Sequence, residues 1–322
     1  MRITLITPAN RQSRAGNRTT AARWARLLRA LGHRVRVATA YQDEPADLMI
    51  ALHAWRSAAA IERFHARHPT RPLIVGLGGT DVYQFLQTEP ATTLRSLELA
   101  DALVGLHDLV GDALPPRCRG KLHVIHQSAP AVTRAAPARG SFDVCVIGHL
   151  RAEKDPLRTA LAARALPPSS RIRVVHLGRA VEPSWADAAR AEMADNPRYR
   201  WLGEVPGWQV RRWLARVRLM VLSSVTEGGA NVISEALVAG VPVLASAIPG
   251  SIGLLGPDYP GYFPVGDTAA LTDLLVQVET DADFLDRLAR AGAARAPLFS
   301  EARERAAWGA LLAQVAPSPA IA

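Results

Sequence analysis

Short apolar segments alternate with amphipathic segments along the whole chain. In the first half, the apolar segments have the length of buried strands, and the residues between them have apolar positions at helical spacing. This β-α-β alternation predicts a parallel sheet with helices on its faces. We expect strands at residues 2–8, 34–39, 47–52, 72–77, 102–106 and 121–125, and helices at residues 17–31, 55–68 and 94–99.

The second half repeats this alternation after a stretch, residues 128–140, that is rich in Pro and Ala and has no periodicity. With 322 residues the chain exceeds a typical single core. We therefore predict an α/β fold of two Rossmann-like parallel-sheet domains, at residues 1–130 and 141–299, joined by a linker at 131–140. In the second domain we expect strands at 142–147, 172–177, 199–202 and 219–222, and helices at 156–165, 185–193, 208–215, 267–278 and 283–294; a last helix is expected at 300–315.

Glu227 and Glu235, eight positions apart, lie in the most informative segment of the chain. An expected strand precedes them, and an amphipathic helix follows, which Gly240 ends as a C-terminal cap. Gly228 and Gly229 let a ligand approach the amides at the helix start, where the helix dipole favours an anion. A carboxylate one turn deeper can accept hydrogen bonds from two vicinal hydroxyls. The arrangement suits a molecule with phosphates in the middle and sugar hydroxyls at both ends, which is a nucleotide sugar.

The same segment, with its double glycine and the tail Glu235-Ala-Leu-x-x-Gly240-Val-Pro-Val, resembles the signature of the retaining glycosyltransferases of family 4. The resemblance implies the GT-B architecture, in which two Rossmann-like domains face a cleft and the last helix, here 300–316, returns to the first domain. It implies that Glu235 holds the ribose hydroxyls and Glu227 the hydroxyls of the donor sugar. An ordinary strand-turn-helix with a solvated Glu235 is the alternative. The amides implied to contact sugar and phosphate belong to Gly228, Gly229, Ala230, Asn231 and Val232.

A second match to the family follows the first strand of the second domain, in Gly148-His-Leu-Arg-Ala-Glu-Lys-Asp-Pro156. Family members usually have Gly-Arg-Leu-x-x-Glu-Lys here, and their Arg and Lys reach the donor diphosphate. Lys154 falls on the Lys position, whereas His149 stands where the Arg is expected, so Arg151 is a candidate substitute. Such cations stabilise the negative charge that develops on departing UDP. The resemblance also implies that the backbone near Val205 reads the uracil.

Composition narrows the choice of protein class. Apolar residues make up 49% and aromatic residues 6% of the chain, and no apolar run approaches the roughly 20 residues that span a bilayer. The apolar start is too short for a signal peptide, and Cys118 and Cys145 lack metal or redox spacing. We therefore expect a cytoplasmic protein that does not act on a membrane. No metal motif accompanies the signature, so neither a metal nor another cofactor is expected.

The charge is unevenly divided. Residues 1–140 carry 19 Lys and Arg against 10 Asp and Glu, whereas the remaining residues are balanced at 19 against 19. Such an excess can indicate nucleic-acid binding, but no aromatic–basic interleaving or binding motif accompanies it, and we expect no nucleic-acid partner. Since 36 of the 38 basic residues are Arg, a general Arg bias on solvated helix faces explains most of the charge.

A polar, basic loop at residues 7–20 joins the first expected strand to the first expected helix. One glycine gives backbone access, one asparagine can cap the helix, and three arginines gather near the amides of the helix start, which together predict an anion site. The alternative is a surface loop whose arginines lie in water. The candidate acceptor-binding residues of this loop are Asn10, Arg11, Arg14, Gly16, Asn17 and Arg18.

Two further candidates end strands of the first domain. His53 follows the strand at 47–52 and matches the strand-end His of many family members, near the reacting centre, so it is a catalytic candidate; a structural His is the alternative. Thr80 lies in Gly78-Gly-Thr-Asp81, which resembles the Gly-Thr/Ser-Asp turn of the family. That turn can border the acceptor or only reverse the chain.

Within this superfamily, residues 6–20, 52–56 and 76–82 are most similar to the selenosugar synthases of selenoneine biosynthesis. The resemblance implies transfer of a hexosyl group from UDP-N-acetylglucosamine or UDP-glucose to selenophosphate, with a new carbon–selenium bond and release of UDP. An anionic nucleophile needs positive charge to hold it and little help from a base, which agrees with the arginines of the first loop.

The alternative is a conventional family 4 transferase that acts on a hydroxyl of a glycan or a lipid-linked sugar. A hydroxyl acceptor favours a base at the acceptor oxygen, and no carboxylate of the first domain stands out as one. A dinucleotide oxidoreductase is excluded, because the first strand is not followed by G-x-G-x-x-G.

Overall fold

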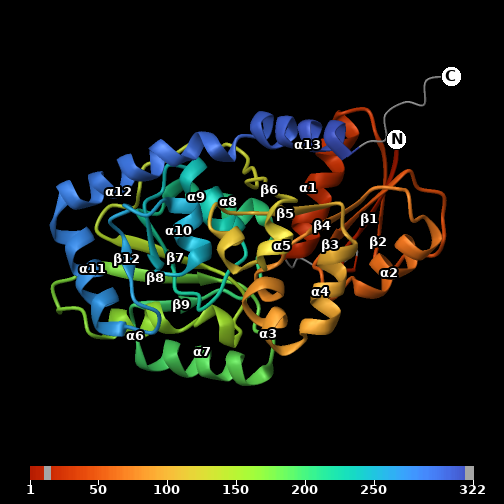
Figure 1. The fold of residues 1–322 in the computed structure, drawn as a ribbon. Helices are drawn as coiled ribbons and strands as arrows, with labels where there is room; N and C mark the ends of the chain where they lie inside the picture. Colours follow the sequence, from red (N-terminus) through yellow and green to blue (C-terminus); the bar gives the residue numbers. More distant parts are fainter. Residues whose placement is uncertain (11–15, 316–322) are drawn as a thin grey trace. The chain divides into compact units, whose positions relative to one another are not determined.

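The structure, a computed structural model, describes residues 1–10 and 16–315. The chain forms two compact units. The first unit consists of Met1–Ser128 together with the helix that begins at Glu301, and the second unit of Ala129–Ser300. Each unit is an α/β body built on one parallel sheet of six strands (Figure 1).

The sheet of the first unit has the strand order β2-β1-β3-β4-β5-β6, and every pair is parallel. All six strands expected in this half are present. β2 pairs with one edge of β1, and β3 pairs with the other edge. The strand order therefore reverses between β1 and β3. The strands are β1 (Arg2–Ile6), β2 (Arg34–Ala38), β3 (Leu48–Leu52), β4 (Leu73–Gly76), β5 (Ala102–Gly105) and β6 (Leu122–Val124).

Both faces of this sheet are covered, as the continuous apolar runs require. Every residue of β3 is buried, and alternate residues belong to different cores. Met49 packs in the core that contains Phe64. Leu48 and Ile50 pack in the core that contains Trp24. A strand buried on both faces cannot slip by one residue without exchanging its two sets of neighbours, which fixes the register.

The helices of the first unit agree with the expected ones in place but not always in their ends. The helix expected from residue 55 begins at Ala58, because the chain first turns at residues 54–57. A π-helical turn at Asp81–Phe85 was not predicted. The remaining elements are α1 (Gly16–Ala30), α2 (Ala58–Arg67), α3 (Leu86–Thr88), α4 (Pro90–Leu99), α5 (Pro116–Arg119), α13 (Glu301–Val315) and a 3₁₀ turn at Val110–Ala113.

The last helix, α13, packs on α1 (Figure 1). Its Glu304 is almost completely buried and accepts hydrogen bonds from Trp24 Nε1 (3.1 Å), Arg23 Nε (3.2 Å) and Ser128 N (2.7 Å). Trp308 packs edge-on against Trp24 with ring centroids 4.7 Å apart. Ser128 Oγ donates to the same carboxylate. A buried carboxylate that is bonded by one cation and three neutral donors holds α13 in a single position on α1.

The sheet of the second unit has the order β12-β11-β10-β7-β8-β9, again all parallel. Its four expected strands are present, and β11 and β12 extend the sheet. The strand order reverses between β7 and β10. The strands are β7 (Phe142–Ile147), β8 (Ile172–Leu177), β9 (Tyr199–Trp201), β10 (Leu219–Leu222), β11 (Val243–Ser246) and β12 (Tyr262–Phe263).

Capping residues fix two helices of this unit. Asp267 and Asp281 accept hydrogen bonds from the amides of Ala270 and Phe284, so α11 and α12 begin directly after these caps. The helices are α6 (Arg158–Arg164), α7 (Pro183–Asp195), α8 (Gly207–Arg216), α9 (Asn231–Val238), α10 (Pro249–Leu255), α11 (Thr268–Thr280) and α12 (Ala282–Arg295), with 3₁₀ turns at Ala152–Lys154 and Ala296–Phe299.

The segment 131–140, expected as a linker between domains, belongs to the second unit. It has no helix or strand, but Arg134 donates hydrogen bonds to the carbonyls of Leu214 (2.5 Å) and Val217 (2.9 Å), and Ala135 N donates to the carbonyl of Ala215 (2.8 Å). These carbonyls lie at the end of α8, where a helix leaves acceptors unpaired. The segment expected as a linker therefore bonds to the end of a helix of the second unit, and its role as a linker stays a prediction.

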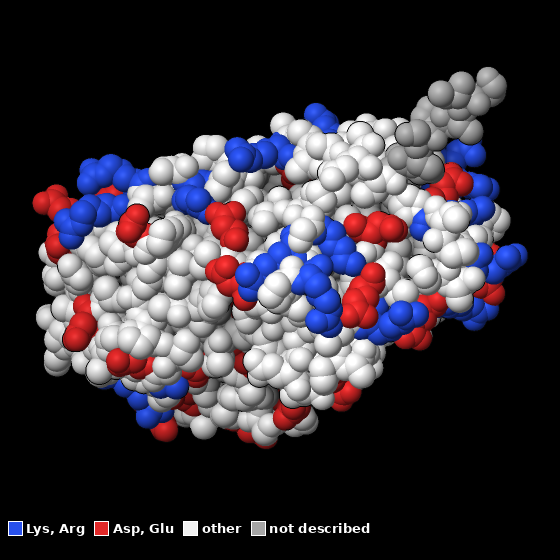
Figure 2. Space-filling model, viewed as in Figure 1, with Lys and Arg blue, Asp and Glu red and all other residues white. Residues whose placement is uncertain are grey.

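Basic side chains gather over α4 and α5 in the centre of the view in Figure 2. Arg117 of α5 pairs with Glu98 of α4 at 3.0 Å, and both side chains are exposed. Such a pair on a solvated face contributes little to stability and agrees with the general Arg bias. Within the described ranges, no helix has the length and apolar character that a membrane span needs.

Candidate active site

The two segments that match the family motifs lie next to each other in the second unit. One follows β7 and the other follows β10, and these strands pair side by side where the strand order reverses. Loops at such a reversal, beyond the carboxyl ends of the strands, form the usual ligand site of an open parallel sheet. The fold therefore brings the predicted Lys154 and Glu227 into one site.

Lys154 and Glu227 form an ion pair at the centre of this site. Lys154 Nζ donates to Glu227 Oε1, and Ser224 Oγ donates to the same oxygen at 2.6 Å. The side chain of Glu227 is 9% exposed and that of Lys154 is 20% exposed. The pair is thus largely desolvated. The electrostatic interaction of either charge with a ligand bound beside it is therefore stronger than it would be in water.

The backbone around Glu227 is fastened on two sides. Val225 N donates to the carbonyl of Glu153 (2.9 Å), which ties the loop after β10 to the loop after β7. Ser246 Oγ donates to the carbonyl of Ser224 (2.5 Å). At the start of α10, a Cβ on Gly250 would lie 2.3 Å from the carbonyl oxygen of Glu227, so only glycine fits there. Sequence reasoning missed Ser224 and Gly250 as parts of the site; Ser224 could have been found from its place in the signature.

Helix α9 begins at Asn231, four residues after Glu227. Gly229 has a φ of +121°, a backbone conformation that favours glycine. Ala230 at the N-cap position is buried and makes no side-chain cap. Glu235 lies one turn further on the same side as Asn231. The half-buried residues of this predicted donor-binding set are Gly228, Gly229, Asn231, Val232 and Glu235.

Three polar atoms near this ion pair are buried without a hydrogen-bond partner among the described residues: Arg151 Nε, Thr226 Oγ1 and Ser251 Oγ. Arg151 Nη1 lies 3.3 Å from Glu153 Oε1, so its guanidinium is held on one side only. Buried polar atoms normally have partners, so these three atoms are candidates to bind a ligand.

His149, which stands in the family's Arg position, is half-buried. Burial is the first cause that lowers the pKa of its imidazole, and the charge of Arg179 is the second. The ring is therefore held in its neutral form more strongly than a free histidine, and the cations of this loop are Arg151 and Lys154. Nδ1 of His149 accepts from the amide of Arg179 at 3.3 Å.

The loop that was expected to read uracil is joined to the same site through β8. Gly178 N donates to the carbonyl of Gly203 (2.8 Å), and Trp201 Nε1 donates to the carbonyl of Gly178 (2.7 Å). A Cβ on Gly178 would lie 1.8 Å from the carbonyl oxygen of Gly148. Val205, two residues after Gly203, is half-buried. Three loop backbones therefore converge at the carboxyl ends of β7, β8 and β9.

In the first unit, His53 and Thr80 are brought together with Asp81. His53 Nε2 lies 2.8 Å from Thr80 Oγ1, and His53 Nδ1 lies 2.7 Å from Asp81 Oδ1. His53 follows β3 and Thr80 follows β4, which is the neighbouring strand. Asp81 belongs to the predicted turn motif but was not among the predicted site residues. Its position directly after Thr80 could have indicated its role.

The basic loop of the first unit is described only in part. Arg11 and Arg14 lie outside the described residues. Gly16 is the first residue of α1, with Asn17 and Arg18 half-buried in its first turn, and Asn10 is exposed after β1. The carbonyl of Asn17 accepts from Thr7 Oγ1 at 3.4 Å. The structure therefore brings Asn17 and Arg18 to the carboxyl end of β1, whereas the proposed cluster of three arginines stays a prediction.

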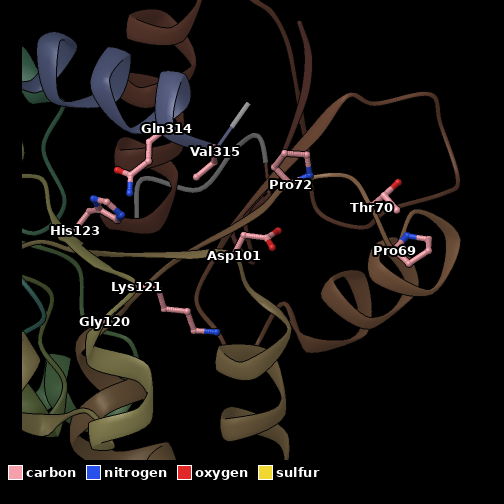
Figure 3. Close-up of a pocket in the computed structure, with 9 residues that line it drawn as sticks. All are labelled: Pro69, Thr70, Pro72, Asp101, Gly120, Lys121, His123, Gln314 and Val315. Carbon is pink, nitrogen blue, oxygen red and sulfur yellow. The ribbon is translucent and has the colours of Figure 1, made fainter. Parts of the chain in front are cut away.

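A pocket of about 440 Å³ lies elsewhere in the first unit (Figure 3). Pro72, Asp101 and Lys121 of its lining precede β4, β5 and β6, so it lies at the opposite sheet edge from His53. Lys121 Nζ already donates to the carbonyls of Glu98 (3.1 Å) and Ala100 (2.6 Å). Because Lys121 already has two partners and the pocket is remote from the carboxyl ends of the strands, we assign the pocket no role in the site.

Comparison with known proteins agrees with this geometry. The family model for glycosyl transferases group 1 matches residues 141–281. The chain is similar in structure to Anabaena HepE solved with UDP and glucose (TM-score 0.76, 15% identity, 98% of this chain and 100% of that chain). It is also similar to sucrose-phosphate synthase from Thermosynechococcus elongatus (TM-score 0.80, 17% identity, 98% of each chain). A glycosyltransferase from Rickettsia africae gives a TM-score of 0.70 at 12% identity over 98% of each chain.

These comparisons confirm the predicted architecture and the predicted enzyme class. The structural similarity extends over nearly the whole length of both chains, and the family match includes both motif segments with Lys154, Glu227 and Glu235. Residues 141–281 are a glycosyltransferase group 1 domain, and the chain that carries it has the GT-B glycosyltransferase fold.

Proposed function

We propose that the protein transfers a hexosyl group from UDP-N-acetylglucosamine or UDP-glucose to selenophosphate, forms a carbon–selenium bond and releases UDP. The observation that carries the proposal is the desolvated Lys154–Glu227 pair at the strand reversal, directly before the start of α9. It offers one cation and one carboxylate, which are the partners that a diphosphate and a sugar hydroxyl need.

For the donor, Lys154 and the amides at the start of α9 take the diphosphate, and Arg151 adds a second cation. Glu227 takes hydroxyls of the transferred sugar, and Glu235, one turn deeper in α9, takes the ribose hydroxyls. Backbone near Val205 takes the base. HepE, the structural relative, was solved with UDP, with UDP and glucose, and with UDP-glucose, which supports a uridine nucleotide.

In the reaction, the bond between the anomeric carbon and the diphosphate oxygen breaks as the carbon–selenium bond forms. The bonding electrons pass to the departing diphosphate, whose added charge Lys154 stabilises. We propose that these donors act without a metal ion. Preorganised charges of this kind provide the largest part of many rate enhancements.

For the acceptor, we propose the carboxyl ends of β1, β3 and β4 in the first unit. Arg18 in the first turn of α1 supplies positive charge together with the helix amides, and Thr80 borders the same strand ends. Selenophosphate is anionic and strongly nucleophilic, so charge rather than a strong base is the main requirement.

The test is incubation of the protein with each UDP-sugar and selenophosphate, with UDP release followed enzymatically and the product by mass spectrometry. We expect a selenium-containing sugar product and UDP in equal amounts, and unchanged rates in the presence of a chelator. Absence of UDP binding, or of UDP release with selenophosphate, would contradict the proposal. Loss of activity on addition of the chelator would contradict the proposal that the reaction needs no metal ion.

A second candidate is a conventional transferase that acts on a hydroxyl acceptor. One observation favours it: His53 pairs with Asp81, and a histidine oriented by a carboxylate is a suitable base for a hydroxyl. The same incubation separates the candidates, because UDP release with sugar alcohols but not with selenophosphate would favour the hydroxyl acceptor.

Arg18 provides a test of the acceptor side. Arg18→Ala is expected to raise the apparent KM for selenophosphate about 10-fold or more, as the loss of one charge-assisted contact implies, and to leave the donor KM within about 2-fold. Arg34→Ala is the matched control, because Arg34 is exposed at the opposite end of the sheet, at the start of β2. Equal changes in both KM values for Arg18→Ala would contradict an acceptor role.

A further inference from the structure

Three polar side chains form a chain of contacts at the carboxyl ends of β3 and β4. Asp81 Oδ1 lies 2.7 Å from His53 Nδ1, and His53 Nε2 lies 2.8 Å from Thr80 Oγ1. Asp81 has no exposed surface and His53 is 3% exposed, whereas Thr80 is half-buried. The chain of contacts therefore begins in the interior and ends at the only member with substantial access to solvent.

The surroundings of Asp81 fix where the protons lie. Its carboxylate accepts hydrogen bonds from the amides of Gly78 (2.8 Å), Ala54 (2.9 Å) and Trp55 (3.0 Å). Three amide donors stabilise the ionised form of a buried carboxyl group, which then has no proton to donate. The short contact with His53 Nδ1 therefore requires that Nδ1 carries the proton.

One contact competes with this assignment. The amide of Arg56 points at His53 Nδ1 from 3.3 Å, which would suit an unprotonated Nδ1. The carboxylate is closer and charged, so its hydrogen bond is the stronger of the two. With the proton on Nδ1, the neutral ring has its lone pair on Nε2, and Nε2 accepts from Thr80 Oγ1.

The backbone holds the ring in this position. His53 has a φ of +75°, a left-handed conformation that is strained for a side chain such as histidine. Gly78 leaves room for the ring, because a Cβ there would lie 3.2 Å from His53 Cδ2. Strain at a strand end beside an oriented histidine is typical of functional sites rather than of ordinary turns.

We propose that Asp81 is a positioning residue that keeps His53 in the Nδ1–H form, so that Nε2 receives, through Thr80, the proton that the acceptor loses. In this step the acceptor's proton passes to Thr80 Oγ1 as the hydroxyl proton of Thr80 passes to Nε2. The imidazolium that forms is paired with Asp81, and the proton returns to solvent after the products leave. Among the described residues, the side chains hydrogen-bonded to His53 or in ring contact with it are Asp81, Thr80 and Phe85, and of these Asp81 alone carries charge.

This inference rests on the proposed function in one respect, namely that the first unit holds the acceptor. It applies to hydrogen selenophosphate and to a hydroxyl acceptor alike, since both release a proton. It can therefore fail while the proposed function holds, and it can hold with either acceptor.

The direct test is NMR of nitrogen-labelled histidine side chains, with the signals of His53 assigned from their loss in His53→Gln. In the wild type we expect a protonated Nδ1 and an unprotonated Nε2. In Asp81→Asn the amide group of the new side chain donates to Nδ1, so the proton moves to Nε2. The same protonated nitrogen in both proteins would overturn the proposal. This measurement needs neither donor nor acceptor.

Activity provides the second test. With a hydroxyl acceptor, Asp81→Asn is expected to lower kcat about 10²- to 10⁴-fold, the usual range for loss of acid–base assistance, and to change the shape of the pH profile of kcat. With selenophosphate the pH profile is expected to change in the same way but the loss of kcat to be smaller, because an anionic nucleophile needs little help from a base. The affinity for UDP, measured by calorimetry, stays within about 2-fold, because the UDP site lies in the second unit. A purely structural role would instead lower the active fraction with an unchanged pH profile, and that result would overturn the proposal.

Thr80 offers a matched pair of variants. Thr80→Ser keeps the hydroxyl and is expected to retain at least about half of kcat, whereas Thr80→Val has the same shape without the hydroxyl and is expected to lose at least about 10-fold. Equal activity of the two variants, with whichever acceptor the wild type uses, would remove Thr80 from the path of the proton.

Discussion

At the scale of single residues, the choice of lysine at position 154 is informative. The chain uses arginine for 36 of its 38 basic residues, and Lys154 is one of the two exceptions. An ammonium is a compact charge with rotatable donors, whereas a guanidinium is a wide planar fork. Lys154 Nζ and Ser224 Oγ both donate to Oε1 of Glu227. A compact ammonium suits this arrangement, in which two donors share one carboxylate oxygen.

Lys154→Ala is therefore expected to lower kcat about 10²- to 10³-fold, the range for loss of one preorganised charge at a leaving group. The measurement is the initial rate of UDP release at saturating donor. The matched control is Lys121→Ala, which removes the other lysine; that residue donates only to the carbonyls of Glu98 and Ala100 in the first unit. Similar losses of kcat in both variants would contradict the role of Lys154.

At the scale of elements, the first turn of α10 packs against the loop that carries Glu227. The contact is a backbone approach at Gly250, where a Cβ would lie 2.3 Å from the carbonyl oxygen of Glu227. A carbonyl in a tethered loop cannot move away freely, because Val225 N and the carbonyl of Ser224 are bonded to neighbouring segments. The helix therefore positions the loop without a side-chain contact.

Gly250→Ala is expected to lower the free energy of unfolding by about 1–3 kcal/mol, as insertion of a methyl group into a packed contact does, and to weaken UDP-sugar binding by moving Glu227. Denaturant unfolding and calorimetry measure the two effects. Gly120→Ala is the control, since a Cβ there would meet nothing within 4 Å. Tight UDP-sugar binding by Gly250→Ala at wild-type stability would contradict this account of the loop.

The sequence was sufficient to predict ten of the twelve strands of the described residues, because most of these strands are apolar runs such as Leu48–Leu52, which its sheet buries on two faces; β11 and β12 were missed. It was less informative where side chains from other segments decide the backbone. The π-helical turn at Asp81–Phe85 begins at a residue whose carboxylate bonds to amides at positions 54 and 55, and no local pattern records that contact. Helix α10 was missed because Gly250 and Gly253 give it low helix propensity.

The candidate site was predictable to the extent that it lies in contiguous motifs. Lys154 and Glu227 were predicted from two separate motifs, and the strand order explains their meeting, since β7 and β10 are adjacent. Gly250 and the pairing of Asp81 with His53 depend on segments that are brought together only by the fold. The contacts of 131–140 could not be predicted for the same reason, because the partners of Arg134 lie at the end of α8, about 80 residues away.

At the scale of the whole molecule, each unit has, among the described residues, one histidine without any exposed surface. His107 follows β5 in the first unit, and His176 lies in β8 of the second unit; neither has exposed surface. Burial lowers the pKa of each imidazole to about 4. His176 is bonded to Tyr199 Oη (3.0 Å) and to the carbonyl of Gly148 (3.1 Å), and His107 Nε2 to Tyr83 Oη (3.2 Å), so both rings fit their sites in the neutral form.

The pKa values of these two histidines predict how stability depends on pH. A histidine with a folded pKa of about 4 and an unfolded pKa of about 6.5 binds more protons when unfolded between these values. Stability is therefore complete above about pH 6.5 and falls as the pH decreases toward about 4, by up to about 3 kcal/mol for each histidine. Calorimetric melting temperatures between about pH 7 and pH 4 are expected to follow this course.

In His107→Gln or His176→Gln the decrease is expected to be smaller, because glutamine does not ionise; curves parallel to that of the wild type would show that other groups cause the acid sensitivity. Because the two histidines lie in different units, the double variant should lose both contributions additively.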